Sequence, residues 1–111
     1  MIDARRMEVF TQRFDAEGNA IDPAAPLILD EAWATTHAPA TVCGDGADKA
    51  LELWSTSAGI EHLRDIRPVA AAMLREAEAR FAERAFDDVA YLVPEYGKAA
   101  NVTQPKARTT G

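Results

Sequence analysis

The chain has 111 residues, of which 48% are hydrophobic and 27% charged, and its net charge is −6 at neutral pH. This composition indicates one small globular domain, or one lobe of a larger protein, and excludes a disordered chain. The acidic balance argues against general nucleic-acid binding, because phosphate backbones attract basic surfaces. The single cysteine, Cys43, excludes an intramolecular disulfide and a multi-cysteine zinc site.

The first segments of the chain predict two antiparallel strands. Residues 7–14 are rich in aromatic and β-branched side chains that alternate between two faces. Residues 15–19 form a turn cluster with Gly and Asn, and residues 26–30 form a short returning strand. The loop between the strands is too long for a tight hairpin.

A strand, a glycine turn and a helix follow in that order. Asp30 is placed to cap a short helix that passes Trp33 and ends at residues 37–39. Residues 40–43 form a brief buried strand. We expect Asp45 to cap the next helix, whose apolar positions recur at helical spacing as far as Trp54.

The last third of the chain predicts one long helix. Residues 60–66 alternate as a strand or an extended connector, and the helix covers residues 68–86, with Pro68 at its first position. Its apolar stripe consists of Ala70, Leu74, Ala77, Phe81 and Ala85, flanked by Val69 and Met73. Glu76 and Arg80 form an i,i+4 pair on its polar side. Residues 90–93 are a last strand.

These elements together predict an α/β fold, with α+β as the alternative, in which a long C-terminal helix packs on a mixed sheet. We expect a single lobe over residues 1–96 and a loose tail over residues 97–111. No apolar run reaches the roughly 20 residues of a membrane span. The first residues also lack the pattern of a secretory signal, so we expect a cytoplasmic protein.

The turn formed by Gly44, Asp45 and Gly46 is the one candidate ligand site. A glycine turn between a strand and a helix presents backbone N–H groups that can bind phosphate or adenosine. This turn matches neither the P-loop nor the dinucleotide-binding pattern. A tight structural connection is therefore the favoured interpretation, and we expect no cofactor.

The sequence offers no convincing catalytic set. Cys43 would need a histidine as its base, but His37 and His62 lie in separate segments and are too far apart for a helical metal pair. The carboxylates of the long helix alternate with arginines, as on a solvated helix face. Trp33 and Trp54 fall on apolar helix faces, which predicts core positions.

Asp3, Arg5 and Arg6 precede the first long strand. The sequence allows two interpretations of this group. A local ion pair could fix the strand, or the arginines could be presented to a partner or an anion, because guanidinium groups suit carboxylates and phosphates.

Three segments resemble the second half of the TsaB family. Ile2-Asp-Ala-Arg-Arg-Met-Glu-Val-Phe10 resembles the isoleucine-aspartate-alanine-arginine run that precedes a Glu-Val-aromatic strand in that family. Gly44-Asp-Gly-Ala47 stands where the family has a glycine turn, and Ala90-Tyr-Leu-Val-Pro-Glu-Tyr96 resembles its closing strand. Val93 and Gly97 depart from the family's usual glutamate and leucine. The resemblance makes Asp3, Arg5, Tyr96 and Lys98 the motif and interaction candidates.

The resemblance implies a lobe of the ribonuclease H-like, actin-like ATPase superfamily. TsaB proteins are non-catalytic scaffolds of the complex that makes threonylcarbamoyladenosine on tRNA. Their partners are the catalytic paralogue TsaD and the ATPase TsaE. The family was long labelled glycoprotease, but these residues offer no protease chemistry.

The resemblance also implies that the N-terminal lobe, with the main partner surface, is missing here. We therefore expect exposed apolar surface and weak self-association. Two alternatives stay open: a degenerate nucleotide-binding lobe, and an unrelated small interaction module.

Overall fold

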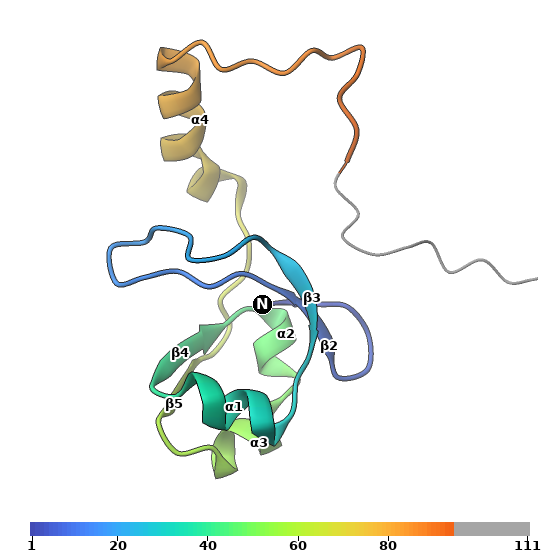
Figure 1. The fold of residues 1–111 in the computed structure, drawn as a ribbon, viewed down its shortest axis with the longest axis vertical. Helices are drawn as coiled ribbons and strands as arrows, with labels where there is room; N and C mark the ends of the chain where they lie inside the picture. Colours follow the sequence, from blue (N-terminus) through green and yellow to red (C-terminus); the bar gives the residue numbers. More distant parts are fainter. Residues whose placement is uncertain (95–111) are drawn as a thin grey trace, which may run out of the picture.

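The structure, a computed structural model, describes residues 1–94. It is a mixed α/β protein with two small sheets and a C-terminal helix (Figure 1). The strands are β1 (Ile2–Asp3), β2 (Glu8–Thr11), β3 (Ala25–Ile28), β4 (Ala40–Cys43) and β5 (Ile60–Leu63). The helices are α1 (Glu31–His37), α2 (Asp45–Asp48), α3 (Leu51–Thr56), the 3₁₀ helix η1 (Ala70–Met73) and α4 (Leu74–Ala82).

The first sheet is antiparallel, with strand order β1-β2-β3. Ile2 pairs with Phe10, and Phe10 pairs with Pro26, so these residues form one row across the sheet. The predicted pairing of the first two long strands is confirmed, although β2 ends at Thr11 and the isolated bridge between Phe14 and Ala20 continues the ladder. Alternation places Val9 on the buried face and Ile28 on the exposed face.

The second sheet consists of β4 and β5, which run parallel. The predicted strand at residues 40–43 is confirmed, and the strand alternative for residues 60–66 is confirmed for the part that forms β5. Asp30 caps α1 as predicted, since its side chain accepts a hydrogen bond from the Trp33 N–H at 2.7 Å. These elements follow from local signals in the sequence.

The helix after the glycine turn differs from the prediction in two ways. It is interrupted at Lys49 and Ala50, which separate α2 from α3, and it continues to Thr56, beyond Trp54, the last apolar position of the predicted helix. Asp45 is not its cap: the N-cap residue is Gly44, without a side-chain hydrogen bond. The Asp45 carboxylate is bound instead by the backbone N–H of Asp3 at 2.9 Å.

The core lies between the first sheet, α1, α2, α3 and β4. Its seven buried hydrophobic residues are Val9, Leu29, Ala34, Val42, Ala47, Ala50 and Trp54. The indole N–H of Trp54 donates to the Ala47 carbonyl at 2.8 Å, which satisfies the polar atom of this large side chain. Trp33 is half-buried and meets Trp54 edge-on. The prediction that Trp54 is a core residue is confirmed, and Trp33 packs at the rim.

The C-terminal part corrects the prediction of a long helix packed on a mixed sheet. The helical residues are limited to η1 and α4, and none of them is buried. Within residues 1–94 the strands form two sheets, and the main neighbour of α4 is η1, so this helix stands away from the body (Figure 1). The predicted Glu76–Arg80 pair is confirmed at 3.0 Å.

Residues 90–93 are also not the predicted strand. Residues 90 and 91 form a turn, and residues 92–94 have no regular structure. No strand of the described part lies beside them to pair with, and an isolated strand is not stable in water. Tyr96, Lys98 and the predicted tail over residues 97–111 lie outside the described residues. In the described part, no helix combines the length and apolarity needed to cross a membrane.

Candidate functional site

The glycine turn is packed against the first residues of the chain. Gly44 has a φ of 103°, and a Cβ placed on it would lie 2.0 Å from the Met1 carbonyl oxygen. A Cβ on Gly46 would lie 2.8 Å from Val9 Cγ1 and 2.9 Å from the Ile2 carbonyl carbon. Both glycines therefore permit a close approach of two backbone segments.

Hydrogen bonds within the chain also occupy this turn. The Met1 ammonium donates to the Cys43 carbonyl at 2.7 Å, and the Gly46 N–H donates to the Met1 carbonyl at 3.2 Å. The N–H groups of Ala47 and Asp48 both donate to the Gly44 carbonyl at 3.0 Å. Three amides that a phosphate would need are thus already bound to backbone oxygens.

Asp3, Asp45 and Lys49 join the first strand to α2, and we call these three residues the Asp3 junction. Asp3 Oδ1 accepts from Lys49 Nζ at 2.5 Å and from the Arg5 N–H at 2.9 Å. Lys49 Nζ also donates to the Glu8 carbonyl at 2.7 Å. The Lys49 ammonium first, and then the Arg5 amide, hold the pKa of Asp3 below its ordinary value.

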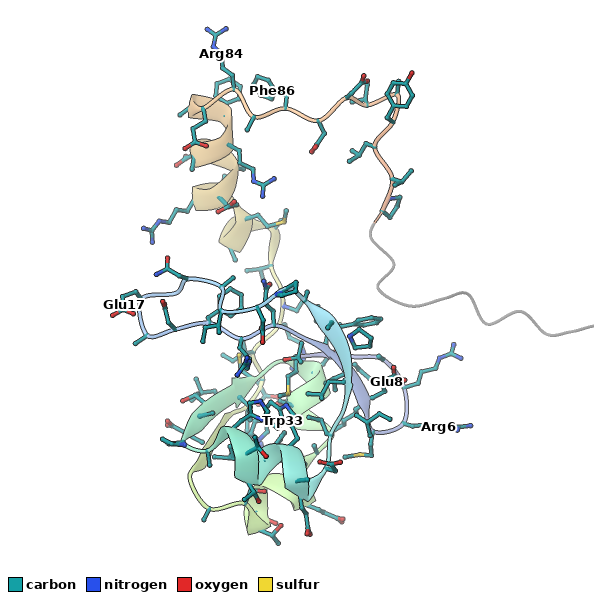
Figure 2. All side chains as sticks on the ribbon, viewed as in Figure 1. Arg6, Glu8, Glu17, Trp33, Arg84 and Phe86 are labelled. Atoms are coloured by element: carbon teal, nitrogen blue, oxygen red, sulfur yellow. The ribbon has the colours of Figure 1, made fainter. Side chains whose placement is uncertain are left out.

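Arg5 contacts Asp3 through its backbone and not through its guanidinium group. Its N–H donates to Asp3, and the ion-pair partner of Asp3 is Lys49 in place of the local arginine that one interpretation of the sequence allowed. Arg5 and Arg6 have φ values of 77° and 52°, and both are exposed. Figure 2 shows Arg6 pointing away from the body.

Sequence reasoning missed Lys49, although a signal was present. It is the one lysine within residues 1–94, and it directly follows Asp48 at the end of the glycine turn and α2. Its ion pair with Asp3 spans 46 positions of sequence, so only the fold reveals the partner.

A second polar cluster is centred on Asp48 at the end of α2. Its carboxylate binds His62 Nε2 of β5 at 2.8 Å and Arg67 NH1 at 2.6 Å. The guanidinium of Arg67, with a smaller contribution from His62, lowers the pKa of Asp48. This cluster ties α2 to β5 and to the connector that leads to η1.

The remaining chemical candidates lie apart from one another. His37 Nδ1 is 2.8 Å from the Trp33 carbonyl, and its ring stacks on Trp33 at 4.5 Å, whereas His62 binds Asp48. Cys43 is a half-buried free thiol. Among residues 1–94, no group of three or more His, Cys, Asp or Glu side chains could hold a metal ion.

Two open depressions lie away from the glycine turn. One of about 340 Å³ lies between α1 and the end of α3, and one of about 250 Å³ is lined by residues that include Arg13, Asp22, Trp33 and His37. Neither is lined by a residue of the turn or of the Asp3 junction. In the second depression, Arg13 is already paired with Asp22 at 2.6 Å.

Comparison with protein-family models, curated proteins and solved structures gives no match. The contacts described above therefore carry the functional argument. They connect the run at residues 2–10 with the turn at residues 44–47, and they leave these glycines in a structural role.

Proposed function

We propose that this chain is a non-catalytic scaffold lobe of the TsaB type, acting in the complex that makes threonylcarbamoyladenosine on tRNA. One observation carries the proposal: two of the segments that resemble TsaB proteins meet in space. Asp3 of the first segment binds Asp45 through its N–H, and Gly46 of the second binds the Met1 carbonyl. A chance likeness of two short motifs would not require them to be in contact.

The finer fold that we propose is a ribonuclease H-like lobe of the actin-like ATPase superfamily. Its support is the contact between the two sheets. Met1 precedes β1 and binds both Cys43 at the end of β4 and Gly46 beyond it, so the antiparallel and parallel strands are neighbours at this point. A lobe of this kind has a mixed sheet, and Met1 is where the two small sheets would join.

A scaffold role suits the way the glycine turn is used. Met1 and Ile2 lie where a ligand would approach the turn, which supports assembly over nucleotide chemistry. In this proposal the partners are a TsaD-type catalytic paralogue and a TsaE-type ATPase in the cytoplasm. The principal interface belongs to the other lobe of the full protein, so this chain alone binds TsaD weakly.

The direct test is a chimaeric protein. The C-terminal lobe of an authentic TsaB is replaced by residues 1–111, and threonylcarbamoyladenosine is measured by mass spectrometry of tRNA nucleosides from cells that depend on the chimaera. We expect the modified nucleoside to be restored. A soluble, folded chimaera that gives none would overturn the assignment. A chimaera carrying Gly46→Val is the matched control, because it disturbs the contact between the two segments.

A second candidate is an interaction module unrelated to TsaB. Two separate small sheets and a helix that stands away from them favour it. Failure of the folded chimaera, together with specific capture of a different protein by the chain, would support this candidate.

Calorimetry distinguishes a nucleotide-binding lobe from both the scaffold lobe and the unrelated interaction module. Titration of the chain with ATP and AMP should give no heat up to millimolar ligand, and turnover of ATP or of a peptide by pure protein would contradict the scaffold proposal.

A further inference from the structure

Asp45 and Gly46 are the one Asp-Gly pair in the sequence. In such a pair the glycine nitrogen can attack the aspartate carboxyl carbon, because glycine has no side chain to hinder the approach. The new bond joins Gly46 N to Asp45 Cγ, and the amide proton leaves with the carboxyl hydroxyl as one water molecule. Hydrolysis of the resulting five-membered succinimide returns one water molecule and gives either aspartate or isoaspartate. Water is the one molecule exchanged, so the reaction needs no oxidant and no co-substrate.

The folded backbone holds this peptide unit in an orientation that cannot react. The Gly46 N–H donates to the Met1 carbonyl at 3.2 Å, and the Asp45 carbonyl accepts from the Lys49 N–H at 3.3 Å. Both groups belong to the planar unit that links Asp45 to Gly46. Ring closure turns this unit about the Cα–C bond of Asp45, away from its helical orientation in α2. Closure therefore breaks both hydrogen bonds.

Strand β1 also restrains the second reacting group, the Asp45 carboxyl. The Asp3 N–H donates to this carboxylate at 2.9 Å. Gly46 is buried, and a Cβ on it would lie 2.9 Å from the Ile2 carbonyl carbon and 3.1 Å from Asp3 N, so the peptide unit has no room to turn. Residues 1–3 thus bind both the attacking nitrogen and the carboxyl that it would attack.

Local opening of β1 requires less free energy than unfolding of the whole body. The strand has two residues, and both are exposed. Arg5 and Arg6 follow it with φ values of 77° and 52°, a left-handed backbone that is strained for arginine. Short elements with few buried contacts open at a lower free energy than the core. Opening β1 releases the Asp45 and Gly46 groups together.

We propose that Asp45–Gly46 is a site of isoaspartate formation that β1 covers, and that the reaction proceeds when β1 leaves the glycine turn. Isoaspartate adds one carbon to the main chain and leaves the former backbone carboxyl as the side group. The hydrogen bonds of α2 then lose their register, and position 45 no longer presents its carboxylate to the Asp3 N–H. The modification therefore keeps β1 open. This inference does not depend on the proposed function, because it rests on the chemistry and contacts of this turn.

The first measurement compares the native chain in mildly acidic buffer with the same chain unfolded in guanidinium chloride. Mild acid supplies the protonated carboxyl, from which water can leave. Chromatography and mass spectrometry follow the tryptic peptide of residues 14–49, and electron-transfer fragmentation locates isoaspartate at position 45. The folded chain should react at least about tenfold more slowly, which corresponds to an opening free energy of at least about 1.4 kcal/mol. Equal rates in the two conditions would overturn the proposal.

Two variants open β1 without changing the reacting pair. Gly44→Ala places a Cβ 2.0 Å from the Met1 carbonyl oxygen and should recover most of the unfolded rate, whereas Gly18→Ala, with no atom within 4 Å of its Cβ, should react as the native chain does. Asp3→Asn removes the ion pair with Lys49 and keeps the Asp3 N–H, so a smaller acceleration is expected. Circular dichroism checks that each variant is folded. Native rates in Asp3→Asn and in folded Gly44→Ala would contradict the proposal.

Leu29→Ala distinguishes opening of β1 from unfolding of the whole body. Leu29 is 3% exposed and belongs to the core, but to neither β1 nor the glycine turn. Its truncation should lower the stability of the whole body and leave the rate of isoaspartate formation close to native. An acceleration as large as that in Gly44→Ala would show that the reaction proceeds from the unfolded chain, and the proposal would fail.

Hydrogen exchange tests whether the modification keeps β1 open. The chain with isoaspartate at position 45 is purified, and exchange is followed in the peptic peptides that cover residues 1–10. The Asp3 amide is bound to the Asp45 carboxylate in the native chain, so its exchange should be at least about tenfold faster after modification. Native exchange in the modified chain would show that β1 returns to the turn and would overturn this part of the proposal.

Discussion

The body of residues 1–63 and the helical segment of residues 70–82 both contain apolar faces but bury them very differently. Within residues 1–94, all seven buried hydrophobic residues lie between Val9 and Trp54. In the helical segment, Met73, Leu74 and Phe81 are each more than half exposed. The body brings together elements that are distant in sequence, whereas the main neighbour of α4 is the adjacent η1.

This difference shows that the periodicity of a sequence defines the apolar face of a helix or strand but does not identify the surface that covers this face. In the body, the turn glycines allow Met1 and Ile2 to approach α2, and this contact closes the core over Val9. The helical segment has a regular stripe and an i,i+4 ion pair, but no element within residues 1–94 buries it. The free energy of unfolding should therefore depend strongly on the contact of Met1 and Ile2 with α2 and weakly on α4.

The largest loss is expected for Gly44→Ala. The new Cβ would lie 2.0 Å from the Met1 carbonyl oxygen, and alanine is strained at a φ of 103°. Strain and overpacking together should lower the free energy of unfolding by about 3 kcal/mol, measured by urea denaturation. Gly18→Ala is the control: its φ is 86°, but no atom lies within 4 Å of the new Cβ, so only the strain of about 1 kcal/mol applies. Equal losses in the two variants would show that Met1 does not pack on the turn.

Val9→Ala tests the core beneath the same contact. Val9 is 0% exposed, and removing two methyl groups from a filled core should lower the free energy of unfolding by about 2 kcal/mol. Val89→Ala makes the same chemical change at a residue that is 88% exposed and should have almost no effect. Similar values at the two positions would remove the contrast between the body and the C-terminal segment.

Local signals were sufficient to predict several parts of the body. Asp30 caps α1 because its side chain reaches an amide three residues ahead, and β4 is a short apolar run bounded by Pro39 and Gly44. The structural interpretation of the glycine turn also agrees with its geometry. In each case the deciding interaction lies within a few residues of the signal.

The parts that were predicted wrongly depend on distant partners. Asp45 has the residue type of a helix cap, but Asp3, 42 positions away, takes its carboxylate. Lys49 was overlooked because its role depends on its contact with Asp3, which lies 46 positions away in the sequence. Sequence spacing does not place these two residues side by side. The long helix was expected to pack on a sheet because its stripe is regular, yet the stripe itself does not identify a sheet. In all three cases the topology of the fold, and not the local sequence, decides which groups come into contact.

Acid should weaken the two polar clusters of the body. The pKa values of Asp3 and Asp48 lie below the ordinary aspartate value of 3.8, owing first to Lys49 and to Arg67 respectively. The unfolded chain therefore binds more protons in acid. The stabilisation is complete above about pH 4 and is lost as pH falls below 3.8 through the folded-state pKa values.

Thermal unfolding followed between about pH 6 and pH 2 measures this effect. Asp48→Asn should lower the melting temperature at neutral pH and flatten the acid limb of the profile. The flattening should be partial, because Asp3, Asp15 and Asp22 also have lowered pKa values. An acid limb that is unchanged in Asp48→Asn would show that this carboxylate does not hold Arg67 and His62 in solution.

The smallest change in stability is expected for Phe81→Ala at low protein concentration. Phe81 is 71% exposed and its ring meets that of Phe86 edge-on, so its removal should change the free energy of unfolding by less than about 0.5 kcal/mol. A loss near that of Val9→Ala in dilute solution would mean that α4 packs on its own body, and the contrast between the two regions would then disappear.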